Sequence, residues 1–312
     1  MDERKKIEEL VRPLRVEPGR KVELAKDYDP GDRAGFVHKK DATQVLERGV
    51  ELLSEYQARL AAQDTDGVLV VLQAIDAGGK DGTIAHVTSG VNPQGVKVHS
   101  FKAPSDEELS HDFLWRCVER LPARGEIGIF NRSHYEEVLV VRVHPEFLGK
   151  QKLPPEDVGD HLWQHRYRSI NDWERHLVDS GFRVVKLFLN ISREEQRVRF
   201  LKRLEDPAKN WKFKSADVAE RDHWDEYQQA YSEMLSQTST EWAPWYVIPG
   251  DHKWFARIAA ASVIVRELMD IDPQWPTFDD AAKAEFARMK AVLESQAPSD
   301  AEPDPATEPK AV

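Results

Sequence analysis

Two patterns of hydrophobic and polar residues alternate along this chain: short, mostly apolar runs, and segments in which apolar residues recur at helical spacing. Five short runs are rich in Val, Ile, Leu and aromatic residues, as expected of β-strands; they cover residues 67–76, 96–101, 126–130, 182–190 and 245–248. Between these runs, apolar residues recur at every third or fourth position, which predicts amphipathic helices. Strands that alternate with helices indicate an α/β fold with a central five-stranded, mostly parallel sheet and helices on both faces.

The helical periodicity allows individual helices to be placed. One helix is expected to start near Asp41, and another is opened by a capping box in which Glu108 follows Ser105 by three positions. The helix after this box is expected to carry one apolar face, formed by Leu109, Phe113, Cys117 and Leu121. Further helices are predicted from Ile84 onward and over 160–180, 193–204, 217–236 and 253–269.

The two ends of the chain differ from this alternating middle part. Residues 1–40 contain Pro and Gly at several positions and are interpreted as an irregular arm packed on the domain. Residues 41–275 form the predicted folded domain, and residues 276–312 a C-terminal helix with a tail. The tail, 297–312, consists largely of Pro, Ala and acidic residues and is predicted to be disordered.

Charge narrows the classes of partner. The 312 residues include 44 Lys and Arg against 55 Asp and Glu, a formal net charge of −11, which argues against a protein that binds nucleic acid. The charges are unevenly spread, because residues 193–214 hold eight basic side chains against four acidic ones. A local cationic surface for another polyanion is therefore compatible with the acidic total.

Other features of the sequence indicate the cellular compartment in which the protein works. The apolar runs are too short and too often interrupted by charge to cross a membrane, and the first residues lack the apolar stretch of a secretory signal. The single cysteine, Cys117, cannot form an internal disulfide. We therefore expect a cytoplasmic protein without a membrane partner.

Candidate chemistry lies where the strands end, because ligands of open α/β sheets bind outside the carboxyl ends of the strands. The first predicted strand runs into Asp76-Ala77-Gly78-Gly79-Lys80-Asp81-Gly82-Thr83. Small residues before a helix N-terminus, with a lysine, are typical of a loop that binds phosphate. The segment does not fit the usual Walker A spacing, and an ordinary glycine-rich turn is the alternative interpretation.

Two further segments carry candidate residues. The third predicted strand ends at Asn131 and Arg132, which could help to bind a metal and a transferring phosphoryl group; a capped turn is equally consistent with them. In the basic segment, Arg199, Lys202 and Arg203 share one helical face. Lys209, Lys212 and Lys214 follow in a predicted lid over about 205–225, and a solvated amphipathic helix is the alternative.

Five ordered motifs together resemble the polyphosphate kinase 2 family. They are GGKDGT at 78–83, FNRSHYEEVLVVRVH at 130–144, DPAKNWKFK at 206–214, DxxERDxWDxY at 217–227 and WYVIPGDHKWFARI at 245–258. The resemblance implies a P-loop kinase-like core with a helical lid, which uses inorganic polyphosphate and Mg²⁺ to phosphorylate nucleotides, or runs in reverse.

The resemblance also implies residue roles. Asp76 and Lys80 correspond to the acid and the lysine of the phosphate loop, and Arg132 to the arginine after the Walker B position. The loop residues Gly78, Gly79, Asp81, Gly82 and Thr83 are then expected to bind phosphate and nucleotide. Arg199, Lys202, Arg203, Lys209, Lys212 and Lys214 are expected to bind polyphosphate.

Two positions depart from the commoner family pattern. Asn131 stands where many members have Asp, and His134 where many have Trp; FNRSHYE resembles the subgroup that accepts both AMP and ADP. Because a neutral Asn offers no charged ligand, Mg²⁺ is expected on Asp76, with Glu136 or Glu137 as a further ligand.

We therefore expect a Mg²⁺-dependent phosphotransferase that converts AMP and ADP to ADP and ATP with polyphosphate, reversibly. Adenine nucleotides, with guanine nucleotides as a further class, are the expected acceptors, and a homodimer or homotetramer the expected assembly. Two alternatives stay open at this point: an ATP-dependent nucleoside monophosphate kinase, and a catalytically inactive polyphosphate-binding protein.

Overall fold

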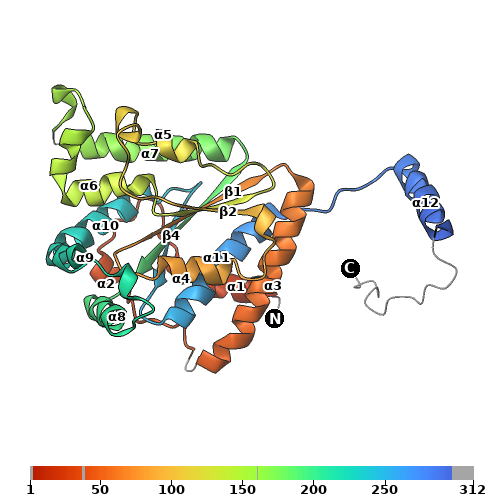
Figure 1. Ribbon diagram of the computed structural model, residues 1–312, viewed down its shortest axis with the longest axis horizontal. Coiled ribbons are helices and arrows are strands. Elements are labelled where there is room, and N and C mark those ends of the chain that lie inside the picture. Colours follow the sequence, from red (N-terminus) through yellow and green to blue (C-terminus); the bar gives the residue numbers. More distant parts are fainter. Residues whose placement is uncertain (1–2, 37–38, 160, 297–312) are drawn as a thin grey trace. The chain divides into compact units, whose positions relative to one another are not determined.

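The computed structural model describes residues 3–36, 39–159 and 161–296. Within them, five strands form one sheet: β1 Gly67–Ala74, β2 Val96–Ser100, β3 Ile127–Asn131, β4 Phe182–Asn190 and β5 Trp245–Pro249. The strand order is β2-β3-β1-β4-β5, and every neighbouring pair is parallel. The predicted α/β fold is confirmed, with a sheet that is parallel throughout (Figure 1).

Helices surround this sheet. The α-helices of the described residues are α1 Glu3–Val11, α2 Leu24–Asp27, α3 Lys39–Gln63, α4 Lys80–Val87, α5 Trp115–Val118, α6 Val140–Val143, α7 Leu162–Asp179, α8 Arg193–Glu205, α9 Ser215–Ala219, α10 Trp224–Thr238, α11 Lys253–Ile271 and α12 Asp280–Ser295. The 3₁₀ turns are η1 Arg12–Leu14, η2 Pro93–Gly95, η3 Glu108–Ser110, η4 His134–Val138, η5 Pro145–Lys150, η6 Pro155–Asp157, η7 Asn210–Lys212 and η8 Glu220–His223.

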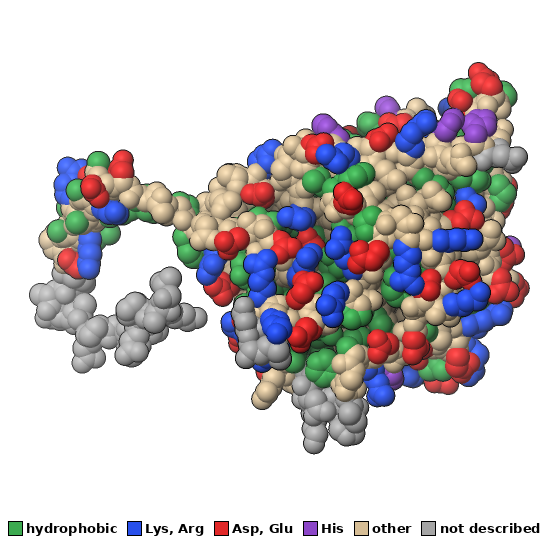
Figure 2. Space-filling model, turned by 180° about the vertical axis from the view of Figure 1, so that it is seen from behind, with side chains coloured by type: hydrophobic (Ala, Val, Ile, Leu, Met, Phe, Trp, Pro, Cys, Tyr) green, Lys and Arg blue, Asp and Glu red, His purple; other side chains and the backbone are tan. Residues whose placement is uncertain are grey.

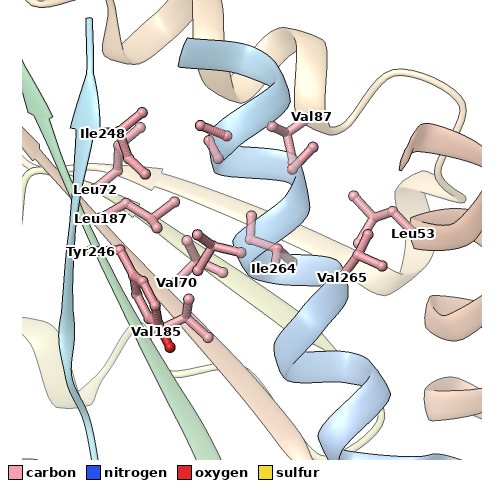
Figure 3. Close-up of a cluster of buried hydrophobic side chains, with 14 of the residues drawn as sticks. Leu53, Val70, Leu72, Val87, Val185, Leu187, Tyr246, Ile248, Ile264 and Val265 are labelled. Carbon is pink, nitrogen blue, oxygen red and sulfur yellow. The ribbon is translucent and has the colours of Figure 1, made fainter. Parts of the chain in front are cut away.

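The core has two layers, one on each face of the sheet. Successive residues of β1 alternate between them: Val70 and Leu72 belong to one layer, Leu69 and Val71 to the other. The first layer holds apolar side chains of α1, α3, α4 and α11. Figure 3 shows Ile264 and Val265 of α11 in this layer, between the strands and α3. The second layer is covered by α7, α10 and the segments around α5 and α6.

The N-terminal arm differs from its prediction as an irregular segment. It begins with α1, whose buried Val11 and partly buried Ile7 and Leu10 pack in the first core layer. After η1, the backbone N–H of Val16 donates to the carbonyl oxygen of Trp245 at 2.8 Å. The arm is thus helical at its start and is joined to the edge strand β5.

Two predicted helices are interrupted. The capping box forms, with reciprocal bonds between Ser105 and Glu108 of 2.7 and 3.2 Å, but only η3 and the single turn α5 follow it. Asp112 accepts a hydrogen bond from the N–H of Leu114 at 2.9 Å, and this local bond competes with a continuous helix. The helix predicted over 217–236 is likewise divided into α9, η8 and α10.

The described residues divide into two compact units, one that ends at Gln274 and one that begins at Trp275. The second unit contains α12, whose N-terminus is capped by Asp279: its Oδ1 accepts from the N–H of Ala282 at 2.8 Å. The disorder predicted for 297–312 concerns residues outside those described. Among the described helices, none is long and apolar enough to span a bilayer.

Candidate active site

The loop between β1 and α4 is a tight turn built from small residues. Ala77 and Gly79 both adopt a left-handed conformation, with φ of 61° and 101°. At Gly78, a Cβ atom would lie 2.5 Å from the Cβ of Ala74 and 2.7 Å from the carbonyl oxygen of Ile75, so only glycine fits. The turn leads directly into the first residues of α4, whose free N–H groups favour an anion.

Lys80 begins α4 and folds its side chain back over this turn. Its Nζ donates to the carbonyl oxygens of Ala74 at 2.7 Å and Ile75 at 3.4 Å. Burial, and to a smaller extent the charge of Arg132, lowers the pKa of Lys80 to about 8. The lysine is therefore mostly protonated at pH 7 but titrates near the physiological range.

Arg132, just after β3, faces the same turn from the neighbouring strand. Its Nη2 lies 2.5 Å from Oδ1 of Asp76, and its Nη1 lies 2.8 Å from Oε2 of Glu136. The charges of Glu136 and Asp76 outweigh burial and raise the pKa of Arg132. Because Leu72 of β1 pairs with Asn131 of β3, the two strands end side by side and bring these groups together.

Asp76, Lys80, Arg132 and Glu136 therefore form a cluster of two cations and two carboxylates. Their formal charges cancel, so the cluster is close to neutral without substrate. Cations held in place before the substrate arrives are what transfer of a phosphoryl group needs, because charge accumulates on the transferring group.

Asn131 and Asp81 connect the neighbouring strand ends. The Asn131 Nδ2 donates to Oδ1 of Asp81 at 2.9 Å and to Oγ of Ser100 at 3.3 Å. The other oxygen of Asp81 lies 3.2 Å from Nζ of Lys212, in the predicted lid. Burial alone would raise the pKa of Asp81, but the hydrogen bonds from Asn131 and Lys212 outweigh it and lower that pKa.

The metal ligands expected from the sequence do not all meet. Glu137 is buried and turned toward Arg166 and Gln151, whose nitrogens lie 3.0 and 2.8 Å from its two oxygens. Among the described residues, no group of three or more His, Cys, Asp or Glu side chains is arranged to hold a metal ion. Asp76 and Glu136 are left as candidates, and two carboxylates completed by substrate phosphates are a donor set that suits Mg²⁺.

Arg199 is buried in the structure, and its contact with polyphosphate stays a prediction. Its side chain is buried beneath the phosphate loop, where Nη1 donates to the carbonyl oxygens of Ala77 and Gly78 at 3.1 and 2.8 Å. Its Nη2 donates to the carbonyl oxygen of Gly250 at 2.5 Å, and its Nε to Glu195 at 2.7 Å. The guanidinium thus ties the ends of β1 and β5 to α8.

The other predicted lid cations are more accessible. Lys202, Lys209, Lys212 and Lys214 are exposed, whereas Arg203 is partly buried, 3.8 Å from Asp217. Burial and the charge of Asp76 raise the pKa of Asp217, which lies in the segment predicted to be a lid. Figure 2 shows one face of the protein, on which basic and acidic side chains are interspersed.

Some residues of the site were missed by sequence reasoning. Gln196 donates from Nε2 to the carbonyl oxygen of Asp76 at 3.0 Å, and Arg221 donates to Oε1 of Gln196 at 2.6 Å. Gln73 is fully buried; its side-chain nitrogen donates to Oε1 of Glu136 at 3.0 Å, and its side-chain oxygen accepts from the N–H and Oγ of Ser133, both at 3.1 Å. A signal existed for Gln73, because it is a polar residue inside an otherwise apolar strand.

A parallel sheet with a phosphate loop after its first strand, and an arginine and carboxylates at the adjacent strand end, defines a kinase-like phosphotransferase. Residues 37–276 match the family described as polyphosphate kinase 2 (PPK2). The chain belongs to this family, which confirms the resemblance seen in the sequence.

Individual relatives cover most of the chain. An ADP-polyphosphate phosphotransferase of Rhodopseudomonas palustris is 47% identical over 284 residues, which are 90% of this chain and 97% of the relative. An AMP/ADP-polyphosphate phosphotransferase of Meiothermus ruber is 45% identical over 288 residues, 91% of this chain and all of the relative. The crystal structure of polyphosphate kinase 2 from Arthrobacter aurescens TC1 superposes with a TM-score of 0.81 at 40% identity, over 91% of this chain and 96% of that chain.

Proposed function

We propose that this protein transfers the terminal phosphoryl group of inorganic polyphosphate to AMP and ADP, giving ADP and ATP, and that the reaction is reversible. The observation that carries the proposal is the contact of Arg132 with both Asp76 and Glu136, next to Lys80 at the end of β1. The names of the relatives from R. palustris and M. ruber support the donor and both acceptors.

The proposed mechanism uses positioning and charge rather than a covalent intermediate. Lys80 and the N–H groups at the start of α4 bind the transferring phosphoryl group. Arg132, held between Asp76 and Glu136, binds the phosphate chain on the other side. The exposed cations at 202, 209, 212 and 214 hold the polyphosphate, whose repeated charge needs no sequence-specific contact.

A metal ion is part of this proposal. Phosphotransferases of this family generally use a divalent metal ion, and we propose Mg²⁺. Asp76 and Glu136 would hold it, and when bound it would neutralise charge on the phosphates. The test is removal of divalent metal ions with a chelator. We expect transfer to be lost and to return when Mg²⁺ is added.

Further parts of the proposal concern the acceptor nucleotides, the lid, the compartment and the oligomeric state. We propose that guanine nucleotides are accepted as well, that residues of about 205–225 act as a lid, and that the chain works in the cytoplasm as a homodimer or homotetramer. The support for the lid is the contact from Lys212 to Asp81, because it joins the segment to the phosphate loop.

One product profile tests the function. AMP, ADP, GMP and GDP are each incubated with Mg²⁺ and either purified polyphosphate or ATP, and the nucleotides are separated. We expect ADP and ATP to form with polyphosphate. Transfer to AMP from ATP alone, with none from polyphosphate, would instead identify a nucleoside monophosphate kinase, and polyphosphate binding without any product an inactive binding protein.

A further inference from the structure

A buried polar cluster lies behind the turn that carries Arg132. Lys186 of β4, Glu174 of α7 and Tyr135 of η4 are all inaccessible to solvent. The Lys186 Nζ donates to Oε2 of Glu174 at 2.6 Å, to Oη of Tyr135 at 3.0 Å and to the carbonyl oxygen of Thr238 at 2.6 Å. All three ammonium hydrogens therefore have acceptors.

The second carboxylate oxygen of Glu174 holds the turn itself. The Tyr135 hydroxyl donates to Oε1 of Glu174 at 2.7 Å, and the Nε2 of His134 lies 3.4 Å from the same oxygen. Burial lowers the pKa of His134, so its ring is neutral. Two consecutive side chains of η4 are thus directed at one buried carboxylate.

This anchor begins two residues after Arg132, which has an unusual backbone. Arg132 adopts a left-handed conformation, with φ of 65°, that is unfavourable for a residue with a long side chain. Its N–H donates to the carbonyl oxygen of Leu72 at 3.1 Å, which fixes the near side of the turn. The far side is fixed by Ser133, which accepts from the N–H of Tyr135, and by the Tyr135 side chain.

Stability alone does not explain the cluster. Bringing a lysine and a glutamate out of water is costly, and replacing a whole buried ion pair with apolar groups of similar volume is often neutral for folding. A strained turn, in contrast, persists only where its surroundings over-determine it. The cluster meets that need, because its Glu174 accepts from Tyr135 and contacts His134, the two residues that follow Ser133.

We propose that Tyr135, Glu174 and Lys186 are positioning residues for Arg132: they hold the turn after β3 so that its guanidinium stays between Asp76 and Glu136. The inference rests on the proposed function only in taking this guanidinium as the group that binds the phosphate chain. None of the three residues is expected to touch substrate, because all are buried behind the turn.

The chain offers a matched control on the opposite face of the sheet. Tyr246 of β5 is also buried and donates from its hydroxyl to Oε1 of Glu267 at 2.8 Å, with Arg266 beside both. Tyr246 belongs to the core layer of α11, whereas Tyr135 belongs to the other. Tyr135→Phe and Tyr246→Phe thus each remove one buried tyrosine–glutamate hydrogen bond, but only the first is next to Arg132.

The experiment compares both variants with the wild type for kcat, KM of ADP and polyphosphate, and thermal midpoint. We expect each variant to lose a few degrees of midpoint. Tyr135→Phe should lower kcat about tenfold to a hundredfold with KM of ADP nearly unchanged, because a misplaced catalytic group affects the transfer step. Tyr246→Phe should keep kcat within about twofold.

Two measurements separate positioning from general damage. In a double-mutant cycle, Tyr135→Phe should cost little further kcat once Arg132→Ala is present, because both act through one group. A crystal structure of Tyr135→Phe should show the contact between Arg132 and Asp76 lost or lengthened. The proposal is overturned if that contact is unchanged, if kcat is unchanged, or if the loss of kcat is the same in the Arg132→Ala background. Failure of the wild type to use polyphosphate would contradict the proposed function instead, and the crystal structure would still decide the positioning role.

Discussion

Lys212 Nζ lies 3.2 Å from Oδ2 of Asp81, so the segment after α8 contacts the first turn of α4. Both side chains are accessible to solvent, and an ion pair of this kind contributes little to folding. Its position suggests a different use. A lysine held over the phosphate loop can turn from Asp81 to a polyphosphate chain when the donor binds.

We therefore expect Lys212→Ala to raise KM of polyphosphate about tenfold while the thermal midpoint stays nearly constant. The dependence of that KM on salt should also become shallower, because one cation fewer displaces counterions from the donor. Steady-state kinetics at several salt concentrations measures both effects.

Lys97 provides the control for this prediction. It forms a comparable surface pair, with Nζ 2.7 Å from Oε1 of Glu126, near the amino ends of β2 and β3. Lys97→Ala should change neither KM of polyphosphate nor its dependence on salt. Equal effects of the two substitutions would show that Lys212 has no special role in binding polyphosphate.

Replacement of two glycines four residues apart, Gly78 in the loop between β1 and α4 and Gly82 in α4, should have opposite effects on stability. Gly78→Ala places a Cβ 2.5 Å from the Cβ of Ala74, so the turn must shift; we expect a loss of about 1–3 kcal/mol in unfolding free energy and of most transfer activity. Gly82 lies inside α4, where an added Cβ meets only Arg257, at 3.8 Å. Gly82→Ala should raise the unfolding free energy by up to about 1 kcal/mol, because alanine favours helix. Chemical denaturation of both variants measures these free energies. A Gly78→Ala variant as stable as the wild type would contradict the steric argument.

The sequence predicted the strands well because a central parallel strand is marked by a run of apolar residues, as at 67–74 and 182–190. It was less informative where short local bonds compete with helix, as at Asp112. The first helix was overlooked although Ile7, Leu10, Val11 and Leu14 have helical spacing, because the prolines and glycines after it dominated the interpretation.

For the site, the sequence indicated which residues meet at the strand ends but not which way each side chain turns. Asp76 and Arg132 could be paired because parallel neighbours end at the same edge. Glu136 and Glu137 are adjacent in sequence, yet they face different groups, since successive residues of a 3₁₀ turn point in different directions. Arg199 looked accessible because arginine is rarely buried, and only tertiary packing shows that its partners are backbone carbonyls.

Lys80 predicts a specific dependence on pH. Its pKa of about 8 lies below that of a free lysine, and we expect transfer to need its protonated form. The specificity constant kcat/KM, which reports the free enzyme, should therefore fall as pH rises through about 8. Lys80→Ala should abolish transfer with the fold intact, as circular dichroism can verify.

Lys80→Arg tests whether Lys80 causes this decline at alkaline pH, because arginine stays charged over the whole pH range of the assay. We expect a lower kcat/KM that no longer declines near pH 8. If the decline persists in Lys80→Arg, another group must titrate there.

Arg199 leads to the last prediction, which separates a structural from a binding role. Arg199→Met removes the donors to the carbonyl oxygens of Ala77, Gly78 and Gly250 and leaves these acceptors without partners. We expect a loss of about 2–4 kcal/mol in unfolding free energy and reduced transfer. The dependence of KM on salt should stay as in the wild type, because the Arg199 guanidinium is buried and already donates to backbone carbonyl oxygens.

Two other cations of α8, Lys202 and Arg197, provide the comparison variants for Arg199→Met. Lys202→Ala, at an exposed position, should make the dependence of KM on salt shallower with little change in stability. Arg197→Ala removes only an exposed contact with Glu194 and should change neither property. If Arg199→Met instead leaves stability unchanged and flattens the salt dependence, Arg199 turns toward polyphosphate when the donor binds, and its contacts with the phosphate loop are exchanged during the reaction.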